Sequence, residues 1–324
     1  MVMAAGLGTR LRPLTYEVPK PLVPVVNRPI MEHVLELLPK HGFEQVIANL
    51  HWYPDSIKAR FGNGSDLGVE LSYSYEDELL GTAGGVRNVA EFFGSDPFLV
   101  LAADALTDID LRALAAAHEE NDGIATLAVK RVANVSEFGV VIAGTDGRIQ
   151  GFQEKPDPVE ALSDLASCMI YLLEPAIFDY FPDDPVVDFA LEVFPALLDH
   201  DVPFYVHEID AYWNDVGSLS EYLQGNLDAL EGAVRVEAAG ELLGEAGGED
   251  ALERGDPGVS GRVLVGEGCG IDETARLDGP LVIGEGCVIG AGARATQAVL
   301  LPGARVAPGS LVAGAVYGRR RDEG

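Results

Sequence analysis

Met3-Ala-Ala-Gly-Leu-Gly-Thr-Arg-Leu-Arg-Pro-Leu-Thr-Tyr-Glu-Val-Pro-Lys-Pro21 is the stretch of this chain that core packing explains least well. Small residues surround its two glycines, so backbone N–H groups can approach a ligand without Cβ atoms in the way. Such N–H groups bind anions, and Arg10, Arg12 and Lys20 add fixed positive charge. The chain has 22 Lys and Arg against 52 Asp and Glu, so these three cations reverse the local sign of charge. The stretch therefore predicts a phosphate-binding loop.

The composition is that of a globular protein, because 324 residues with 48% hydrophobic content allow two domains with a substantial core. No apolar run is long enough to span a membrane, and no charged segment precedes an apolar one as in a secretory signal. We therefore expect a cytoplasmic protein without a membrane partner. The first strand is short before the glycine loop, which suggests a trimmed or misplaced start.

The net charge of −30 argues against a nucleic-acid partner, whose phosphates this chain would repel. An anionic nucleotide would need a locally cationic pocket and the help of a divalent metal. Cys168, Cys269 and Cys287 are too few for a disulfide framework and lack metal-ligand spacing. They fit a reducing compartment.

Strands and helices alternate through the first two thirds of the chain. This order predicts a Rossmann-like α/β domain over residues 1–231, with a mainly parallel sheet and ligands at the carboxyl ends of its strands. Ser218 and Glu221 form a capping box that starts the last helix of this domain, which ends near Gly232. The predicted strands are 45–50, 69–75, 98–103, 124–131, 139–143, 148–154, 168–173 and 203–209, and the predicted helices are 29–40, 54–61, 110–121 and 187–200.

Residues 232–258 read as an acidic, Gly/Ala-rich linker. Beyond it, apolar residues recur every six positions, which predicts a hexapeptide-repeat parallel β-helix over 259–317, with a frayed tail at 318–324. A second row four positions after each anchor should also face inward, and Cys269 and Cys287 should stack there, one coil apart. The anchors are Val259, Val265, Ile271, Leu277, Ile283, Ile289, Ala295, Leu301, Ala307 and Ala313, and the second row is completed by Ala275, Leu281, Ala293 and Val299.

Two acids stand out as metal ligands. Asp104 follows the apolar strand that ends at Ala103, and Asp215 lies in Trp213-Asn214-Asp215-Val216-Gly217. A carboxylate at the carboxyl end of a strand sits where α/β proteins bind ligands, although Asp104 could also cap a helix. Asp108 and Asp110 are better placed for capping. Mg²⁺ needs only one or two carboxylates beside phosphate oxygens and water, so this pair suffices.

The string Gly6-Leu-Gly-Thr-Arg-Leu11, with Pro13, Thr15 and Pro19-Lys-Pro21, resembles the N-terminal motif of the sugar-phosphate nucleotidyltransferases, or NDP-sugar pyrophosphorylases. The resemblance covers essentially the whole chain and implies a left-handed β-helix at its end. It implies transfer of a nucleotidyl group from an NTP to a sugar 1-phosphate. Mannose 1-phosphate with GTP is our first expectation for the substrates, and glucose 1-phosphate with UTP or dTTP is the second.

The resemblance also implies a role for each matching residue. Catalysis would rest on Arg10, Lys20 and Lys155, and Mg²⁺ on Asp104 and Asp215. The sugar phosphate would contact Gly139, Glu154, Lys155 and Ser167, where Ser167-Cys-Met169 departs from the family's Asn-Ala-Gly. The nucleotide would lie against Ala5, Gly6, Gly8, Thr9, Arg10, Gly81, Thr82 and Ala83.

Two other classes of function stay open at this stage. An acyltransferase would suit the β-helix, but it usually needs a His base, and all six His precede the repeat. A catalytically silent, sugar-nucleotide-sensing subunit is the other, although the joint presence of Arg10, Lys20, Asp104, Lys155 and Asp215 argues against it. The open coil ends of a β-helix favour a homo-oligomer.

Overall fold

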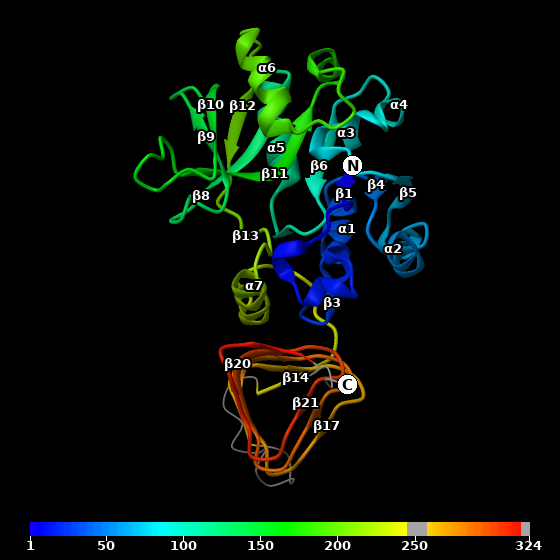
Figure 1. Cartoon of the computed structure of the whole chain (residues 1–324), viewed down its shortest axis with the longest axis vertical. Helices are drawn as coiled ribbons and strands as arrows, with labels where there is room; N and C mark the ends of the chain where they lie inside the picture. Colours follow the sequence, from blue (N-terminus) through cyan, green and yellow to red (C-terminus); the bar gives the residue numbers. More distant parts are fainter. Residues whose placement is uncertain (245–257, 319–324) are drawn as a thin grey trace. The chain divides into compact units, whose positions relative to one another are not determined.

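The computed structural model describes residues 1–244 and 258–318. Close contacts divide these residues into two compact units, whose elements Figure 1 labels. The first unit consists of residues 1–8, 15–21 and 34–215. The second consists of residues 9–14, 22–33 and the described residues from 216 onward. The predicted division at 231 stays a prediction.

Nine strands of the described residues form the sheet of the first unit. Its parallel part has the order β6-β1-β4-β5, in which β1 (Val2–Met3) lies between β4 (Gln45–Leu50) and β6 (Phe98–Ala102), and β5 (Glu70–Tyr75) is at the edge. All three pairings are parallel, as the alternation of strands and helices predicts. The carboxyl ends of these strands meet at one edge of the sheet.

The other part of the sheet is joined through β11 (Leu165–Leu173), which runs antiparallel to β6, to β8 (Ala125–Arg131) and to β9 (Gly139–Ala143). A hairpin joins β9 to β10 (Ile149–Glu154), whereas β12 (Tyr205–Glu208) runs parallel to β8. The whole sheet is therefore mixed, and the parallel character that the sequence predicts belongs to its first part.

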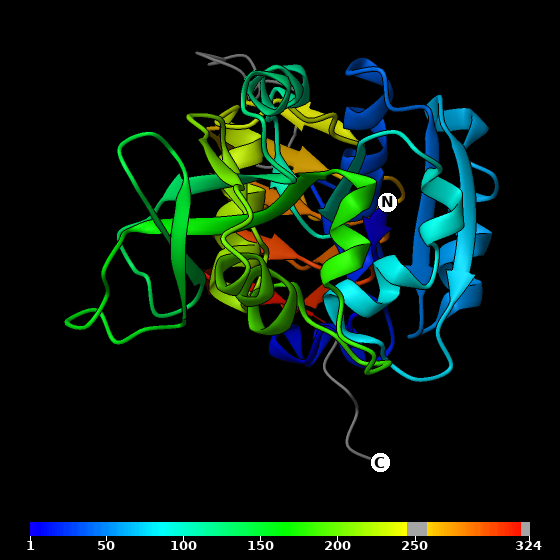
Figure 2. The ribbon, with the colours of Figure 1, turned by 90° about the horizontal axis from the view of Figure 1, so that it is seen from above.

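Helices lie on both sides of this sheet (Figure 2). Helix α5 (Leu111–Glu120) packs against β8, β11 and β12, and α6 (Phe194–Asp199) packs against β10. The carboxylate of Asp110 caps α5 by accepting N–H groups from Arg112 and Ala113. The amide of Ala113 is the main cause that lowers the pKa of Asp110 below its usual value. Asp110 thus takes the capping role that was the alternative for Asp104.

Most predicted elements are confirmed within one or two residues. The helix predicted at 187–200 is instead a π-helical turn, η6 (Phe189–Val193), followed by α6. The remaining elements of the first unit are α2 (Pro54–Phe61), α3 (Gly81–Arg87), α4 (Ala90–Phe93), β7 (Leu106–Thr107), β13 (Trp213–Asn214), and the 3-10 helices η2 (Leu14–Tyr16), η3 (Lys20–Leu22), η4 (Ser65–Leu67) and η5 (Pro175–Tyr180). Helix α1 (Ile30–Lys40) begins in the second unit and continues into the first.

The second unit holds the hairpin of β2 (Pro24–Val25) and β3 (Arg28–Pro29) against α7 (Leu219–Glu231). The side-chain oxygen of Asn226 accepts the N–H of Val26, and the hydroxyl of Tyr222 donates to the carbonyl of Pro24. Ser218 caps α7 by accepting the N–H of Glu221, and the helix ends at Gly232 in a left-handed conformation, as predicted.

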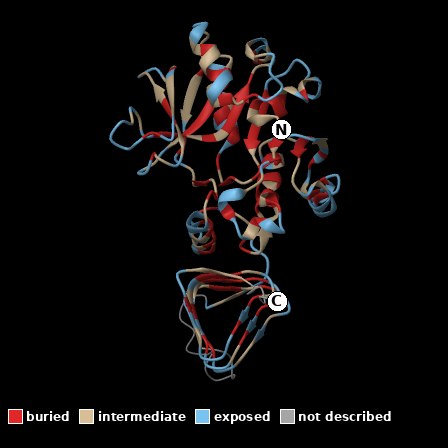
Figure 3. Ribbon diagram, viewed as in Figure 1, coloured by how far each residue is buried: buried red, intermediate tan, exposed pale blue. Residues whose placement is uncertain are grey.

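Residues 258–318, here called the coil, stack parallel strands along the chain (Figure 1). One sheet of the coil has the order β16-β18-β20-β22, which β14 (Glu241–Leu243) extends at the β16 edge, and the other has the order β17-β19-β21. Apolar side chains fill the interior. In Figure 3 the red parts of the coil ribbon mark its buried residues. The strands are β15 (Gly258–Ser260), β16 (Val263–Val265), β17 (Gly270–Ile271), β18 (Arg276–Ile283), β19 (Val288–Ile289), β20 (Arg294–Leu300), β21 (Arg305–Val306), β22 (Leu311–Ala313) and β23 (Val316–Tyr317).

The strict repeat of six is wrong after Ala295. Leu277 pairs with Ala295, an offset of 18 residues, but Ile283 pairs with Leu300, an offset of 17. The cause is a bulge, since Gly279 and Pro280 on β18 lie opposite the single residue Gln297 on β20. The predicted interior positions Val299, Leu301, Ala307 and Ala313 are therefore replaced in the interior by Ala298, Leu300, Ala304, Val306 and Val312.

The predicted linker and tail lie partly outside the described residues, which omit 245–257 and 319–324. Within the described part of the linker, β14 (Glu241–Leu243) pairs antiparallel with β16. Cys287 is buried in the coil interior, where burial raises the pKa of its thiol to about 11. Cys269 packs against the same interior cluster, so burial describes this pair better than reactivity. No helix of the described residues is long and apolar enough to cross a membrane.

Candidate active site

The glycine loop and Asp104 meet at the carboxyl edge of the parallel strands. Met3 of β1 pairs with Ala102 of β6, and the N–H of Ala103 donates to the carbonyl of Met3 at 3.0 Å. The glycine loop starts directly after Met3, and Asp104 follows directly after Ala103. The sheet register thus places the predicted phosphate loop beside the first predicted metal ligand.

Lys20 joins the two predicted metal ligands. Its ammonium nitrogen lies 2.5 Å from Oδ2 of Asp104 and donates to the backbone carbonyl of Asp215 at 3.0 Å. The side chain of Lys20 is 11% exposed and that of Asp104 28%, so the ion pair is largely shielded but open to small ligands. Three residues that are far apart in the sequence therefore form one charged cluster.

The structure requires a glycine at one of the two glycine positions of the loop and not at the other. Gly8 has φ +61°, and a Cβ atom there would lie 3.0 Å from both Lys20 Cβ and Thr15 Cγ2. The hydroxyl of Thr15 also donates to the carbonyl of Gly8 at 2.7 Å, so the loop is fixed against Lys20. A Cβ atom on Gly6 would meet no protein atom within 4 Å. Protein packing therefore does not require a glycine at position 6, and the contact of Gly6 with a nucleotide stays a prediction.

Asn49 and Glu76 form a buried polar pair that the sequence analysis did not single out. The amide of Asn49 donates to the Glu76 carboxylate at 2.7 Å, and its carbonyl oxygen accepts the N–H of Ala4. The other carboxylate oxygen of Glu76 accepts the N–H of Leu80. The pair therefore fixes the glycine loop relative to the segment at residues 80–84. Polar residues at the ends of two neighbouring strands were the available signal.

The predicted nucleotide residues Gly81, Thr82 and Ala83 form the first turn of α3. The N–H of Ala83 donates to the carbonyl of Val187 at 2.9 Å. The hydroxyl of Thr82 donates to the carboxylate of Asp188 at 2.8 Å. Much of the polar capacity of this turn is therefore used inside the protein.

Gly139, Glu154 and Lys155 lie together at the end of the β9–β10 hairpin, as the resemblance implies. Glu154 pairs with Gly139, and a Cβ atom on Gly139 would lie 3.1 Å from Oε2 of Glu154. Lys155 has φ +44°, a conformation that costs a residue with a side chain about 1 kcal/mol or more. Its ammonium lies 3.5 Å from Glu154, with both side chains about half exposed. Such strain at a charged, accessible residue is typical of a binding site.

Ser167 opens a bulge in β11, because residues 168–170 lie opposite one residue of β8. Its hydroxyl lies 3.0 Å from that of Tyr171, and the indole N–H of Trp213 donates to the carbonyl of Cys168. Met169 stands where the family often has Gly, and its φ of +55° is a conformation that favours glycine. The departure from Asn-Ala-Gly therefore keeps a glycine-like backbone without a glycine.

Thr9 and Arg10 belong to the second unit, where they start the 3-10 helix η1 (Thr9–Leu11). Both residues are exposed. Ala5, directly after the strand, is buried. The assignment of Thr9 and Arg10 to the nucleotide stays a prediction.

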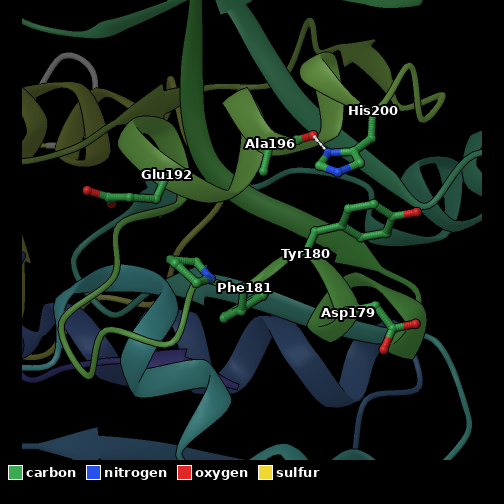
Figure 4. Close-up of a pocket in the computed structure, with 7 residues that line it drawn as sticks. Asp179, Tyr180, Phe181, Glu192, Ala196 and His200 are labelled. Carbon is green, nitrogen blue, oxygen red and sulfur yellow. Dashed lines mark hydrogen bonds between the residues drawn. The ribbon is translucent and has the colours of Figure 1, made fainter.

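None of these residues lines the cavity of about 610 Å³ shown in Figure 4. It is lined by Asp179, Tyr180, Phe181, Pro182, Glu192, Ala196 and His200. His200 lies against the ring of Tyr180, and its Nδ1 is hydrogen-bonded to the carbonyl of Ala196. The cavity contains none of the predicted site residues.

The donor set at the sheet edge suits a hard divalent cation only in part. Among the described residues, no group of three or more His, Cys, Asp or Glu side chains could hold a metal ion. The carboxylate of Asp104 is already paired with the Lys20 ammonium, and Asp215 contacts that ammonium through its backbone carbonyl. Two carboxylates fit Mg²⁺ when phosphate oxygens complete its ligands. A nucleotide would have to supply them.

Comparison with known families gives a match to the nucleotidyl transferase model over residues 1–232. A UTP–glucose-1-phosphate uridylyltransferase of Synechocystis is 36% identical, over 98% of this chain and 87% of the relative. A mannose-1-phosphate guanylyltransferase of Mycobacterium tuberculosis is 34% identical, over 96% of this chain and 82% of the relative.

Solved structures of low identity share the fold. A UDP-glucose pyrophosphorylase from Acinetobacter baumanii superposes with a TM-score of 0.62 at 24% identity, covering 71% of this chain and 93% of that one. HddC from Yersinia pseudotuberculosis gives a TM-score of 0.61 at 22% identity, covering 69% of this chain and 96% of that one. These two similarities support the mixed α/β fold alone.

Proposed function

The chain belongs to the nucleotidyl transferase family, and from this premise we propose that it transfers a nucleotidyl group from an NTP to a sugar 1-phosphate, releasing pyrophosphate. The relatives of 36% and 34% identity carry the names of two such enzymes. The residues that would perform the reaction are those of the sheet edge and of the β9–β10 hairpin.

The observation that carries the proposal is the position of Lys20 between Asp104 and Asp215. A fixed ammonium beside a glycine loop can neutralise charge on the α-phosphate of an NTP. The open space over Gly6 lets the triphosphate approach the backbone N–H groups of the loop. Lys20 would exchange Asp104 for a phosphate oxygen as the nucleotide binds.

Asp104 and Asp215 would hold Mg²⁺, which would supply positive charge to neutralise the phosphates. Release of Asp104 from Lys20 supplies the first carboxylate for that role. Arg10 would take the departing β- and γ-phosphates, as the resemblance implies. With these assignments, the ammonium of Lys20 would be available to neutralise charge on the α-phosphate.

Lys155 would hold the phosphate of the sugar 1-phosphate, and Glu154 would accept hydrogen bonds from sugar hydroxyls. Gly139 keeps the backbone beside the sugar free of a Cβ atom, and Ser167 would offer a hydroxyl where the family has Asn. The left-handed backbone at Lys155 aims a charged side chain from a tight turn, which supports a role in binding.

In the reaction, a sugar-phosphate oxygen would attack the α-phosphorus of the NTP in line. The bond from that phosphorus to the bridging oxygen would break, and pyrophosphate would leave with the electron pair. No covalent enzyme intermediate is required, so positioning and charge neutralisation by Lys20 and Lys155 would provide most of the catalysis.

Mannose 1-phosphate and GTP are the proposed substrates, and glucose 1-phosphate with UTP or dTTP is the alternative pair. Gly81-Thr-Ala-Gly84 favours the guanylyl branch, and the relative of 34% identity is named for it. The relative of 36% identity is named for the uridylyl reaction, so the substrate experiment below also includes UTP and glucose 1-phosphate.

For the rest of the chain we propose a transferase domain over 1–231, a linker over 232–258 and a left-handed β-helix over 259–317. Parallel pairing at offsets of 17 and 18 residues supports a β-helix. Its open ends support a homo-oligomer. Light scattering of the full chain should therefore give a mass above that of a monomer, and a monomer would overturn this part of the proposal.

The test of the function is pyrophosphate release from a matrix of five NTPs and several sugar 1-phosphates with Mg²⁺. We expect one best pair, with GTP and mannose 1-phosphate as the first expectation. A best pair of UTP and glucose 1-phosphate would keep the reaction and correct the substrates. Silence across the matrix with nucleotide still bound would favour the regulatory subunit.

A further inference from the structure

We propose that residues 182–189, here called the α3 strap, position the nucleotide-binding turn at the start of α3, with Asp188 as the positioning residue. The inference rests on the proposed function for what that turn binds. The strap lies about a hundred residues after α3 in the sequence, yet it contacts both ends of that helix.

The first N–H groups of a helix have no acceptor within the helix, and the backbone of the strap supplies acceptors for two of them. The carbonyl of Val187 accepts the N–H groups of Ala83 at 2.9 Å and Gly84 at 3.0 Å, and the N–H of Val187 donates to the carbonyl of Leu80. Gly81 has φ +76°, and a Cβ atom there would collide with the backbone of Val187. The strap and the turn are thus fitted closely to each other.

Asp188 then ties the side chain of Thr82 to the strap. One carboxylate oxygen of Asp188 accepts the hydroxyl of Thr82 at 2.8 Å, and that hydroxyl accepts the N–H of Phe189 at 3.0 Å. The other oxygen caps η6 by accepting the N–H groups of Ala190 and Leu191. One side chain therefore fixes α3 relative to the helix that follows the strap.

Arg87 closes the other end of α3. Its guanidinium donates to the carbonyl of Pro182 at 2.5 Å and to the carbonyl of Asp184 at 2.5 Å. The N–H of Asp188 donates to the carboxylate of Glu192 at 2.7 Å, and both Pro182 and Glu192 line the cavity of Figure 4. Residues that line the cavity therefore also hold the strap in place through these hydrogen bonds.

The consequence concerns binding of the nucleotide and leaves the chemical step unchanged. Lys20 and Asp104 contact each other at the sheet edge, whereas the first turn of α3 is held by the strap together with the hydrogen bond from Leu80 to Glu76. Loss of the Asp188 carboxylate removes a charge-assisted hydrogen bond from a partly buried hydroxyl. The turn would then lose its fixed position, and the nucleotide would have to order it on binding.

The test compares Asp188→Ala with Asp188→Asn and with the control Asp183→Ala. Asp183 is an exposed acid of the same strap, so its loss changes the net charge equally. We expect Asp188→Ala to raise the KM for the NTP about tenfold, the factor for losing roughly 1.4 kcal/mol. The kcat and the KM for the sugar phosphate should stay within about twofold. Asp188→Asn should have a KM close to that of the wild type, because its amide can donate to the Thr82 hydroxyl while its carbonyl oxygen still caps η6.

Hydrogen exchange separates this inference from the proposed function. In Asp188→Ala the amides of Ala83 and Gly84 should exchange faster, whether or not any sugar phosphate is turned over, while those of β18 should not change. An unchanged NTP KM with unchanged exchange would overturn the inference, as would an equal fall of every kinetic constant. Should Asp188→Ala not fold, Thr82→Val removes the same hydrogen bond from the other partner. Because Thr82 is itself a proposed nucleotide contact, the deciding readout for this variant is the exchange of the Ala83 and Gly84 amides without nucleotide, which must be faster.

Discussion

The β9–β10 hairpin with the β11 bulge and the coil both contain left-handed backbone, but they place it at different residues. In the coil, positive φ angles fall on Gly at seven positions and on Gln297 alone among the other described residues there. In the hairpin and the bulge, a positive φ falls on Gly147 at the hairpin turn and also on two residues with side chains, Lys155 and Met169. A glycine adopts this conformation without strain, so the coil needs only the shape of the backbone. Lys155 and Met169 keep side chains in the same strained conformation, and from this we propose that the Lys155 side chain is needed for function, which variants can test.

If the candidate site serves catalysis and the coil serves structure, the largest loss of activity is expected at Asp104. Asp104→Asn keeps the shape of the side chain but removes the charge that faces Lys20. We expect kcat to fall by roughly 10²–10³, as when one electrostatic contact to a transition state is lost. Initial rates of pyrophosphate release check this. A fall of less than threefold would remove Asp104 from the proposed metal site.

In the coil, the expected effect is on stability. Ile283 is fully buried in the interior, so Ile283→Ala should lower the free energy of unfolding by about 2–5 kcal/mol. The rate per folded molecule should not change. Denaturant unfolding measures the difference, with Leu311→Ala as the control, since Leu311 is 68% exposed on the same coil. Equal losses in the two variants would contradict the interior that we describe.

Strain at the site should appear as a difference between two variants of Lys155. Both Lys155→Ala and Lys155→Gly lose the ammonium, so both should raise the KM for the sugar 1-phosphate similarly. Only glycine relaxes the φ angle of +44°, so Lys155→Gly should be more stable than Lys155→Ala by about 1 kcal/mol. Thermal unfolding measures this. Equal stability would mean that the turn is not strained.

The smallest effect is expected at the bulge of the coil. Gln297 has φ +45°, so Gln297→Gly should raise the free energy of unfolding by about 1 kcal/mol or less. Activity should be unchanged, because position 297 needs only its backbone shape. A loss of activity with retained folding would break the contrast between the two regions.

The sequence predicts those features that depend on local chemistry. Asp110 and Ser218 cap helices as their spacing indicates, and β4 and α2 have the predicted bounds. The buried pair of Asn49 and Glu76 could not be predicted in the same way, because it joins the ends of different strands. The slip at Gln297 was missed since small apolar residues occupy both possible registers after Ala295.

The candidate site was predicted residue by residue, but its connections were not. Motifs identified Lys20 and Asp104, whereas their meeting depends on the register of β1 against β6 and on the packing of Gly8 against Thr15 and Lys20. The roles of Thr82 and Asp188 toward each other depend on a contact between segments about a hundred residues apart. A local pattern contains no information on such a contact.

The most direct test of the account is pyrophosphate release with Mg²⁺ and the best substrate pair, measured for Lys20→Ala beside Lys40→Ala. Lys40 is an exposed lysine at the end of α1 and controls for the loss of one positive charge. We predict that Lys20→Ala loses at least about a hundredfold in kcat, while its unfolding transition stays close to that of Lys40→Ala. Turnover by Lys20→Ala at the rate of Lys40→Ala would contradict the assignment of the sheet edge as the site of nucleotidyl transfer.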